Sequence, residues 1–271
     1  TSCEFKCFLD NDTEVEASWV DAPLKMFEKD QKLGIIQCKL ILSKERNKLD
    51  YVGELLGQNG FLVQYVIGGT EDTGDFESEH IILAAKSAGM FARTEAVKKA
   101  GYFDEDYFIY VEETDLGWRV WLSGYTCTYC PNSIVYHESG TSTVLLGSRK
   151  TDYNAKFHGC KNYILTLLKN LDNRSLIKIL PIHIGLWIGM AWYILFKFKF
   201  KQFFWIHKGI LWNFANLDKN LRKREKIQKS RKISDEELFS KIMTNRSFSY
   251  FIGKATAKRK VGNAQGFVRE E

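Results

Sequence analysis

The sequence predicts an α/β fold in which helices flank a sheet, followed by a helical tail. Through residues 1–150, apolar runs with strand spacing alternate with runs of helical spacing, which is typical of a sheet with helices on its faces. After residue 150 the strand pattern ends, and aromatic and aliphatic residues recur every three or four positions. The 271 residues are 45% hydrophobic and include only 3 prolines, which excludes collagen-like and mostly disordered chains.

The first elements are predicted from apolar runs and one capping residue. Residues 5–9 form a short apolar run that predicts a buried strand. Ser18 can cap a helix over 19–30, whose apolar side chains share one face. The continuous apolar run at 33–42 predicts a second strand. Scattered glycines between residues 45 and 79 predict an irregular region suited to an active-site loop.

The next elements repeat the alternation, with glycine as the stop signal. Gly101 ends one predicted helix and Gly124 ends another, because glycine readily adopts the left-handed conformation that closes a helix. The predicted strands are residues 81–83, 87–91, 125–130 and 133–136, and the predicted helices are residues 94–100, 113–123 and 153–170.

The net charge of +6 combines two parts of opposite sign. Residues 1–196 contain 20 Lys and Arg against 26 Asp and Glu, a net charge of −6. Residues 197–271 contain 19 against 7, a net charge of +12. The acidic body and the basic tail therefore predict different partners.

The chain start and the cysteines indicate the compartment. The chain begins at Thr1, and no signal-peptide core precedes the first strand, so we expect a fragment from a reducing compartment. Its six cysteines are then expected to be free thiols. Cys127 and Cys130 form a CxxC pair, but no second ligand pair follows at zinc spacing, so buried thiols are favoured over a zinc site.

Three side chains that can bind a metal follow predicted strands. Asp10 and Asp12 come directly after the first strand, and His137 comes directly after the last. Ligands of open α/β sheets lie at the carboxyl ends of strands, and Mg²⁺ in such sites uses one or two carboxylates with substrate phosphates. A turn or helix cap in the first case and a hydrogen-bonded core or surface histidine in the second are the alternative interpretations.

An acidic and aromatic segment lies between them, at residues 103–119. Six carboxylates occur within twelve residues, interleaved with aromatic and aliphatic side chains. The apolar residues indicate a packed segment, so some of the acids are expected to face a cleft, a metal or a basic partner. Adjacent, partly buried carboxylates raise each other's pKa, which suits a general base. A solvated charged segment is the alternative.

Together these three segments resemble the inverting nucleotide-sugar glycosyltransferases of family 2, in their rhamnosyltransferase-like and galactofuranosyltransferase-like branch. The resemblance covers roughly residues 5–170. It implies a GT-A-type, Rossmann-like mixed sheet that is incomplete at the N-terminus, because the family's nucleoside-binding unit is expected before Thr1. The matching segments are FLDNDTEVEASWV, SAGMFARTEAVKKAGYFDEDYFIYVEETDLGWRVWLSGY and CPNSIVYHESGTS.

The resemblance also implies roles for particular residues. Asp10, Asp12 and His137 would hold Mg²⁺ or Mn²⁺ on the donor diphosphate. Glu113, which stands where the family commonly has Asp, would be the general base on the acceptor hydroxyl. Glu112 would be its partner in the acidic pair, and Asp115 would support the base or the acceptor. The residues expected near the donor or acceptor are Asn11, Asp72, Gly89 and Trp118, although Trp118 suits a structural position behind the site.

The tail suggests a membrane. Residues 179–196 are apolar except for His183, and FFWIHKGILWNF at 203–214 is an amphipathic run beside several lysines. We expect attachment to the cytoplasmic face of the cell membrane through a hairpin or interfacial helices. A buried helix hairpin is the alternative. The expected domains are a partial catalytic domain at 1–150, a helical membrane-associated region at 151–216 and a basic tail at 217–271.

The function that follows is a nucleotide-sugar-dependent glycosyltransferase of cell-surface polysaccharide, glycolipid or cell-wall synthesis. The expected partners are a nucleotide-sugar donor, a glycan or lipid-linked saccharide acceptor and membrane lipid, but no nucleic acid. Without the nucleoside-binding unit, little turnover is expected from this chain alone. The alternatives are a catalytically incomplete membrane-bound binding module and, from the +12 tail, a nucleic-acid binder.

Overall fold

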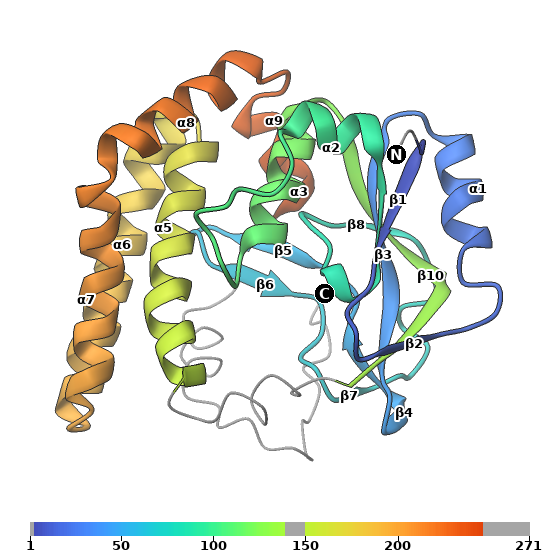
Figure 1. Ribbon diagram of the computed structural model, residues 1–271, viewed down its shortest axis with the longest axis horizontal. Coiled ribbons are helices and arrows are strands. Elements are labelled where there is room, and N and C mark those ends of the chain that lie inside the picture. Colours follow the sequence, from blue (N-terminus) through green and yellow to red (C-terminus); the bar gives the residue numbers. More distant parts are fainter. Residues whose placement is uncertain (1–2, 139–149, 246–271) are drawn as a thin grey trace.

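The computed structural model describes residues 3–138 and 150–245, which form a mixed α/β structure with helices on both faces of a sheet (Figure 1). This confirms the predicted fold class at the level of a mixed sheet flanked by helices. The main sheet has eight strands, ordered β1-β9-β3-β10-β2 along its path. They are β1 (Phe5–Phe8), β2 (Thr13–Val15), β3 (Leu33–Leu42), β4 (Glu45–Tyr51), β7 (Thr70–Glu71), β8 (His80–Ile81), β9 (Met90–Arg93) and β10 (Thr126–His137).

The parallel pair β3 and β10 forms the centre of this sheet. β3 is buried from Leu33 to Ile41, which agrees with its continuous apolar run, because helices cover both of its faces. β10 is one strand where the sequence predicted two. Its register against β3 shifts between Cys130 and Ile134, where Pro131 has no N–H to donate to the ladder.

The strand directions bring three strand ends to one edge of the sheet. β1 is antiparallel to β9, and β9 is antiparallel to β3, so β1, β3 and β10 all run the same way. Asp10 and Asp12 follow β1, and His137 is the last residue of β10. These side chains therefore lie at the carboxyl edge, as predicted from the sequence.

Three helices cover the two faces of the sheet. α1 (Asp21–Lys29) lies on one face, where Phe27 packs in a buried cluster with Ile36 and Phe91. α2 (Thr94–Ala100) and α3 (Glu112–Leu122) lie on the other face, where Trp118 and Trp121 belong to the largest buried cluster (Figure 1). The predicted ends of both helices are confirmed, since Gly101 and Gly124 adopt positive φ values of 85° and 86°.

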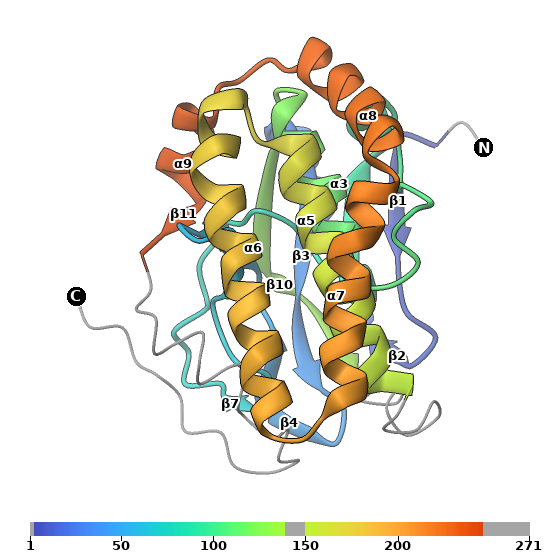
Figure 2. The same cartoon turned by 90° about the vertical axis from the view of Figure 1, so that its left-hand side faces the viewer.

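A layer of helices packs outside α3 (Figure 2). α5 packs against α3, and both α7 and α8 pack against α5, while α6 and α7 lie side by side. The bounds are α5 (Gly159–Asn170), after a π-helical turn at Asn154–His158, then α6 (Asn173–Phe196), α7 (Phe200–Ala215), α8 (Leu217–Ser230) and α9 (Asp235–Ile242). The division into three domains stays a prediction, although the described parts of all three pack against one another.

A small second sheet combines the last strand of the described chain with two strands between residues 54 and 64. It has the order β11-β5-β6 and consists of β5 (Glu54–Gly57), β6 (Leu62–Gln64) and β11 (Met243–Thr244). β11 pairs parallel to β5, with Met243 opposite Leu56. The segment after α9 therefore returns to the body of the molecule.

Two sequence predictions about the first 80 residues are wrong. Ser18 does not cap α1, which begins at Asp21, and Ser18 instead accepts the Asp21 N–H through its main-chain oxygen. The region from 45 to 79 is not irregular but contains β4, β5, β6 and β7. Its glycines at 53, 60, 69 and 74 have positive φ and lie in the connections around these short strands.

Two predicted strands are shorter than expected, and the thiol prediction is confirmed. Ser87–Gly89 is a 3₁₀ turn, so β9 begins only at Met90, and β8 covers His80–Ile81. Cys127 and Cys130 are free and buried, and burial raises the pKa of the Cys130 thiol to about 11. Residues 139–142 of the third matching segment and 246–271 of the tail lie outside the described residues.

Gly117 tests how closely α3 approaches the segment beside β8. A Cβ at this position would lie 2.8 Å from both the Ala84 Cα and the Leu83 carbonyl oxygen, which are main-chain atoms. We expect Gly117→Ala to lower the free energy of unfolding by about 1–3 kcal/mol, because the helix must move. Urea denaturation measures it. Gly185→Ala on α6 is the control: no atom lies within 4 Å, so a gain of about 0.5–1 kcal/mol is expected. Equal effects would contradict the close contact.

Candidate active site

A group of three metal-binding side chains lies at the carboxyl edge of the sheet. The ligand atoms of Asp10, Asp12 and His137 all lie within 4.8 Å of one another, and His137 Nε2 is 3.5 Å from Asp12 Oδ1. β2 brings them together, because Thr13 is paired with His137 across the ladder to β10. Two carboxylates and an imidazole at this spacing fit a divalent cation such as Mg²⁺ or Mn²⁺.

Asp50 supports this group and was missed by the sequence analysis. Its Oδ2 lies 2.9 Å from His137 Nδ1, and its side chain is 4% exposed. A carboxylate on one imidazole nitrogen fixes the ring so that the other nitrogen faces the metal position. Burial opposes protonation of His137, but the hydrogen bond to Asp50 and the charges of Asp50 and Asp12 outweigh it and raise the pKa. The missed signal was an aspartate inside the apolar run at 49–52.

Ser87 joins this group to the acidic pair at the start of α3. Glu113 Oε1 accepts hydrogen bonds from the Ser87 N–H at 3.1 Å and from the Ser87 hydroxyl at 2.9 Å. The same hydroxyl lies 3.2 Å from Asp10 Oδ1. A hydroxyl has one proton, so it can donate to one of these carboxylates at a time. Ser87 therefore bridges Glu113 and the metal-binding group. After Asp50, it is the second residue of the site that the sequence analysis missed.

Glu112 lies beside them in a different environment. It is partly buried, and its Oε2 has no hydrogen-bond partner among the described residues. Burial and then the charges of Glu113 and Asp10 raise the pKa of Glu112 to about 7. A carboxyl group that titrates near neutral pH next to a metal-binding group is a feature of functional sites.

Three of the remaining acids face basic partners within the chain. Asp115 is fully buried, and its oxygens accept from Arg119 at 2.9 Å, Lys169 at 3.0 Å and Asn170 at 2.9 Å. These partners all lie in α3 and α5, so Asp115 ties the two helices together.

Asp104 and Asp106 bind helices α5 and α8. Lys169 lies 2.6 Å from Asp104, and Lys219 and Lys223 each lie 2.6 Å from Asp106. Burial opposes ionisation of Asp104, but Lys169 and Lys223 outweigh it, so its pKa is lowered. Part of the positive charge of the tail is thus neutralised inside the protein.

The predicted donor- or acceptor-binding residues lie in varied surroundings. Asn11 is exposed in the turn between Asp10 and Asp12. Asp72 pairs with the buried Lys39 at 2.6 Å. Gly89 is buried, and a Cβ there would lie 2.7 Å from the Leu40 side chain. Trp118 is fully buried in α3, the helix that begins with the acidic pair.

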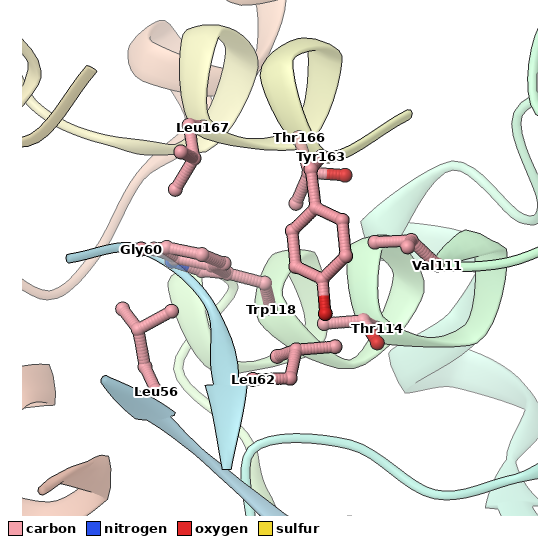
Figure 3. A pocket seen from close by; sticks show the side chains of 9 residues that line it. All are labelled: Leu56, Gly60, Leu62, Val111, Thr114, Trp118, Tyr163, Thr166 and Leu167. Carbon is pink, nitrogen blue, oxygen red and sulfur yellow. The ribbon is translucent and has the colours of Figure 1, made fainter. Parts of the chain in front are cut away.

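Trp118 lines a small cavity between α3, α5 and the small sheet (Figure 3). Tyr163 extends from α5 toward Thr114 and Leu62, and the cavity has a volume of only about 10 Å³. That is about the space of one water molecule, so the cavity is a packing feature and not a substrate pocket.

Comparisons with known proteins give two partial sequence relatives. No family model matches the chain. Over 54 residues it is 39% identical to an N-acetylglucosaminyl-diphospho-decaprenol L-rhamnosyltransferase of Mycobacterium tuberculosis. This match covers 20% of this chain and 18% of the relative. Over 154 residues it is 27% identical to the O-antigen biosynthesis protein RfbC of Myxococcus xanthus, covering 52% of this chain and 11% of the relative.

The matches thus span less than a fifth of the length of these relatives. Among solved structures, GalNAc-T7 with UDP, GalNAc and Mn²⁺ aligns with a TM-score of 0.43 at 13% sequence identity, over 63% of this chain and 32% of that one.

The raised pKa of Glu112 predicts a pH-dependent stability difference in the metal-free protein. Its folded pKa of about 7 exceeds the model-peptide value of 4.5, so between these pH values the folded state holds a proton that the unfolded state has lost. The free energy of unfolding therefore falls as the pH rises through this window. We expect Glu112→Gln to match the wild type below pH 4.5 and to be more stable by up to about 3 kcal/mol at pH 8.

Urea denaturation in the presence of a chelator at pH 4, 6 and 8 measures this difference. The matched control is Glu105→Gln in the same segment, whose side chain is exposed and whose replacement is expected to change stability by less than about 0.5 kcal/mol. A Glu112→Gln advantage that does not grow with pH would contradict the buried carboxyl group.

Proposed function

We propose that this protein is an inverting, metal-dependent glycosyltransferase of family 2 with a GT-A-type fold, acting on a nucleotide-sugar donor. The observation that carries the proposal is Ser87, whose hydroxyl lies within hydrogen-bond distance of both Asp10 and Glu113. A base and a group that can hold a diphosphate-bound cation are thereby adjacent. The names of the two sequence relatives, a rhamnosyltransferase and an O-antigen biosynthesis protein, support the same chemistry.

The residues of the site have separate tasks in this proposal. A divalent cation held by Asp10, Asp12 and His137 would neutralise the charge of the departing nucleoside diphosphate. Glu113 takes the proton from the acceptor hydroxyl, which then attacks the anomeric carbon from the side opposite the leaving group. The Ser87 N–H and hydroxyl hold the Glu113 carboxylate in place.

Glu112 affects Glu113 through charge. Its carboxyl group is half protonated near pH 7, and in the protonated form it removes one negative charge from beside the base. Asp50 and Asp115 have supporting roles, since Asp50 orients His137 and Asp115 anchors α3 to α5.

We further propose a lipid-linked saccharide as the acceptor and the cytoplasmic face of the cell membrane as the location. α6 is the one helix of the described residues long and apolar enough to span a membrane, and only 28% of its apolar window is buried. His183 of α6 binds the Asn59 carbonyl oxygen at 3.0 Å, which keeps the helix against the body. An arrangement in the interface is therefore favoured over a span.

The outer face of α7 supports that arrangement. Its large apolar residues Phe200, Phe204, Leu211 and Phe214 are 55–64% exposed and recur at spacings of four, seven and three, which places them on one stripe. Lys197, Lys199 and Lys201 lie beside the stripe and are attracted by anionic lipid. A nucleic-acid partner is disfavoured, because Lys219 and Lys223 are paired with Asp106.

Glycosyl transfer is tested by nucleoside diphosphate release from a panel of nucleotide sugars, with Mn²⁺ and a lipid-linked acceptor. We expect Glu113→Gln to lower kcat by about 100-fold or more, because the base is lost, and Asp12→Ala to abolish the Mn²⁺-dependent turnover, because a ligand of the cation is lost. Glu105→Gln, an exposed acid of the same segment, is the control and should retain wild-type activity. A fully active Glu113→Gln protein would remove Glu113 from the role of base.

The membrane surface is tested by flotation with vesicles that contain anionic lipid. The wild-type protein is expected to float with the vesicles, and Phe204→Glu combined with Leu211→Glu is expected to abolish flotation, because charge replaces the inserted side chains. Ile67→Glu changes an equally apolar, 44% exposed residue outside α7 and should leave flotation unchanged. Loss of flotation in the Ile67 variant alone would refute the assignment to α7.

A further inference from the structure

The segment that leads into the acidic pair has a strained backbone. Phe108, Tyr110 and Val111 have φ values of 67°, 68° and 70°, in the left-handed region that non-glycine residues rarely adopt. Val111 is β-branched, which makes its conformation a genuine outlier, and it directly precedes Glu112. Such residues cost roughly 1–3 kcal/mol each and persist only where the surroundings hold them.

Asn162 of α5 lies against this segment. Its side chain is fully buried, and Nδ2 lies 3.1 Å from the Tyr107 oxygen, 2.8 Å from the Ile109 oxygen and 2.7 Å from the Tyr110 oxygen. All three partners are main-chain acceptors, so only the NH₂ group can face them and the amide orientation is fixed by chemistry. The Asn162 side chain therefore binds the carbonyl groups of the two residues that flank Phe108. It also binds the carbonyl group of Tyr110, the residue before Val111.

The helix that carries Asn162 is a rigid support. α5 is buried along its length and packs against α3, α7 and α8. The neighbouring Lys161 binds the Asp106 carbonyl oxygen, and the Tyr107 hydroxyl lies 2.7 Å from Thr166 Oγ1. Side chains of α5 thus supply hydrogen-bond donors to the strained segment, Trp212 of α7 packs beside it, and Glu112 and Glu113 follow it directly.

We propose that Asn162 is a positioning residue, which holds residues 107–111 in the strained conformation and thereby sets Glu113 against Ser87 and Asp10. Without its amide, the Ile109 and Tyr110 carbonyl groups lose this donor, while the Tyr107 oxygen keeps the Ile109 N–H and the Lys161 ammonium, and the segment relaxes toward ordinary backbone angles. The start of α3 then moves, and Glu113 leaves the Ser87 hydroxyl. The effect on catalysis rests on the proposed function, but the effect on the backbone does not.

A purely structural role predicts a different result. If Asn162 only fills the core, its removal lowers stability and activity together, as for any buried asparagine. If it holds strained backbone, its removal releases strain energy, so the loss of stability is smaller than at an unstrained site while the loss of activity is larger. A positioning role therefore predicts a smaller loss of stability and a larger loss of activity than a purely structural role does.

The test compares Asn162→Ala with Asn213→Ala. Asn213 of α7 is 5% exposed, and its Nδ2 also binds two main-chain carbonyls, those of Lys161 at 3.0 Å and Gly209 at 3.1 Å, neither of which belongs to residues 107–111. We expect Asn162→Ala to lower kcat by about 100-fold with donor KM within twofold, and to lower the Tm less than Asn213→Ala does. Asn213→Ala should keep kcat within twofold. Equal losses of activity in the two variants, in proportion to their Tm, would overturn the proposal.

Hydrogen exchange and Mn²⁺ binding give a readout independent of sugar transfer. Faster exchange of the peptide that contains residues 107–115 is expected in Asn162→Ala but not in Asn213→Ala, with unchanged Mn²⁺ affinity because Asp10, Asp12 and His137 lie outside this segment. Unchanged exchange in Asn162→Ala would refute the positioning role. If exchange is faster in Asn162→Ala but the wild-type protein transfers no sugar, the positioning role is supported and the proposed function is refuted. Asn162→Ser, which keeps one donor, should give intermediate values and carries the test if the alanine variant does not fold.

Discussion

The parallel pairing of β3 with β10 determines where the other parts of the structure lie. Opposite residues run from Leu33 with Thr126 to Leu42 with His137, and β3 is buried along nearly all of this length. β1 joins through β9 in the same direction, and β2 joins the far end of β10. The carboxyl edge therefore combines segments that are more than one hundred residues apart in the sequence. Strand pairing, and not the loops, sets their relative positions.

Charge has a second and less obvious place in the architecture. The acidic segment before α3 and the basic helix α8 are far apart in the sequence, and each has an unfavourable excess of one charge. In the structure, Asp104 and Asp106 lie against Lys169, Lys219 and Lys223, so both excesses are reduced at one contact. Close, partly buried pairs are screened less by salt than surface pairs, which makes this contact a stable connection between the helical layer and the site. The net charge of the chain gives no indication of this contact.

The sequence predicted local features well where one pattern acts alone. β3 was predicted from its apolar run, α2 from its glycine stop, and the strand-end positions of Asp10, Asp12 and His137 from the alternation of strands and helices. Ser18 failed as a cap because α1 begins at Asp21, three residues later. The region from 45 to 79 failed because short strands paired through turns with glycine have the composition of a loop. Asp50 and Ser87 were missed, since their partners His137, Asp10 and Glu113 become neighbours only after the sheet has formed.

The pairing of β11 with β5 has a consequence for synthesis of the protein. Met243 lies opposite Leu56, so the small sheet needs two segments that leave the ribosome at very different times. Until the later one emerges, β5 has an unpaired edge, which is a template for pairing with another chain. Contacts of such sequence separation also form slowly, because the loop between them must close first. The nascent chain is therefore expected to depend on chaperones or on early docking of its helices during most of its translation.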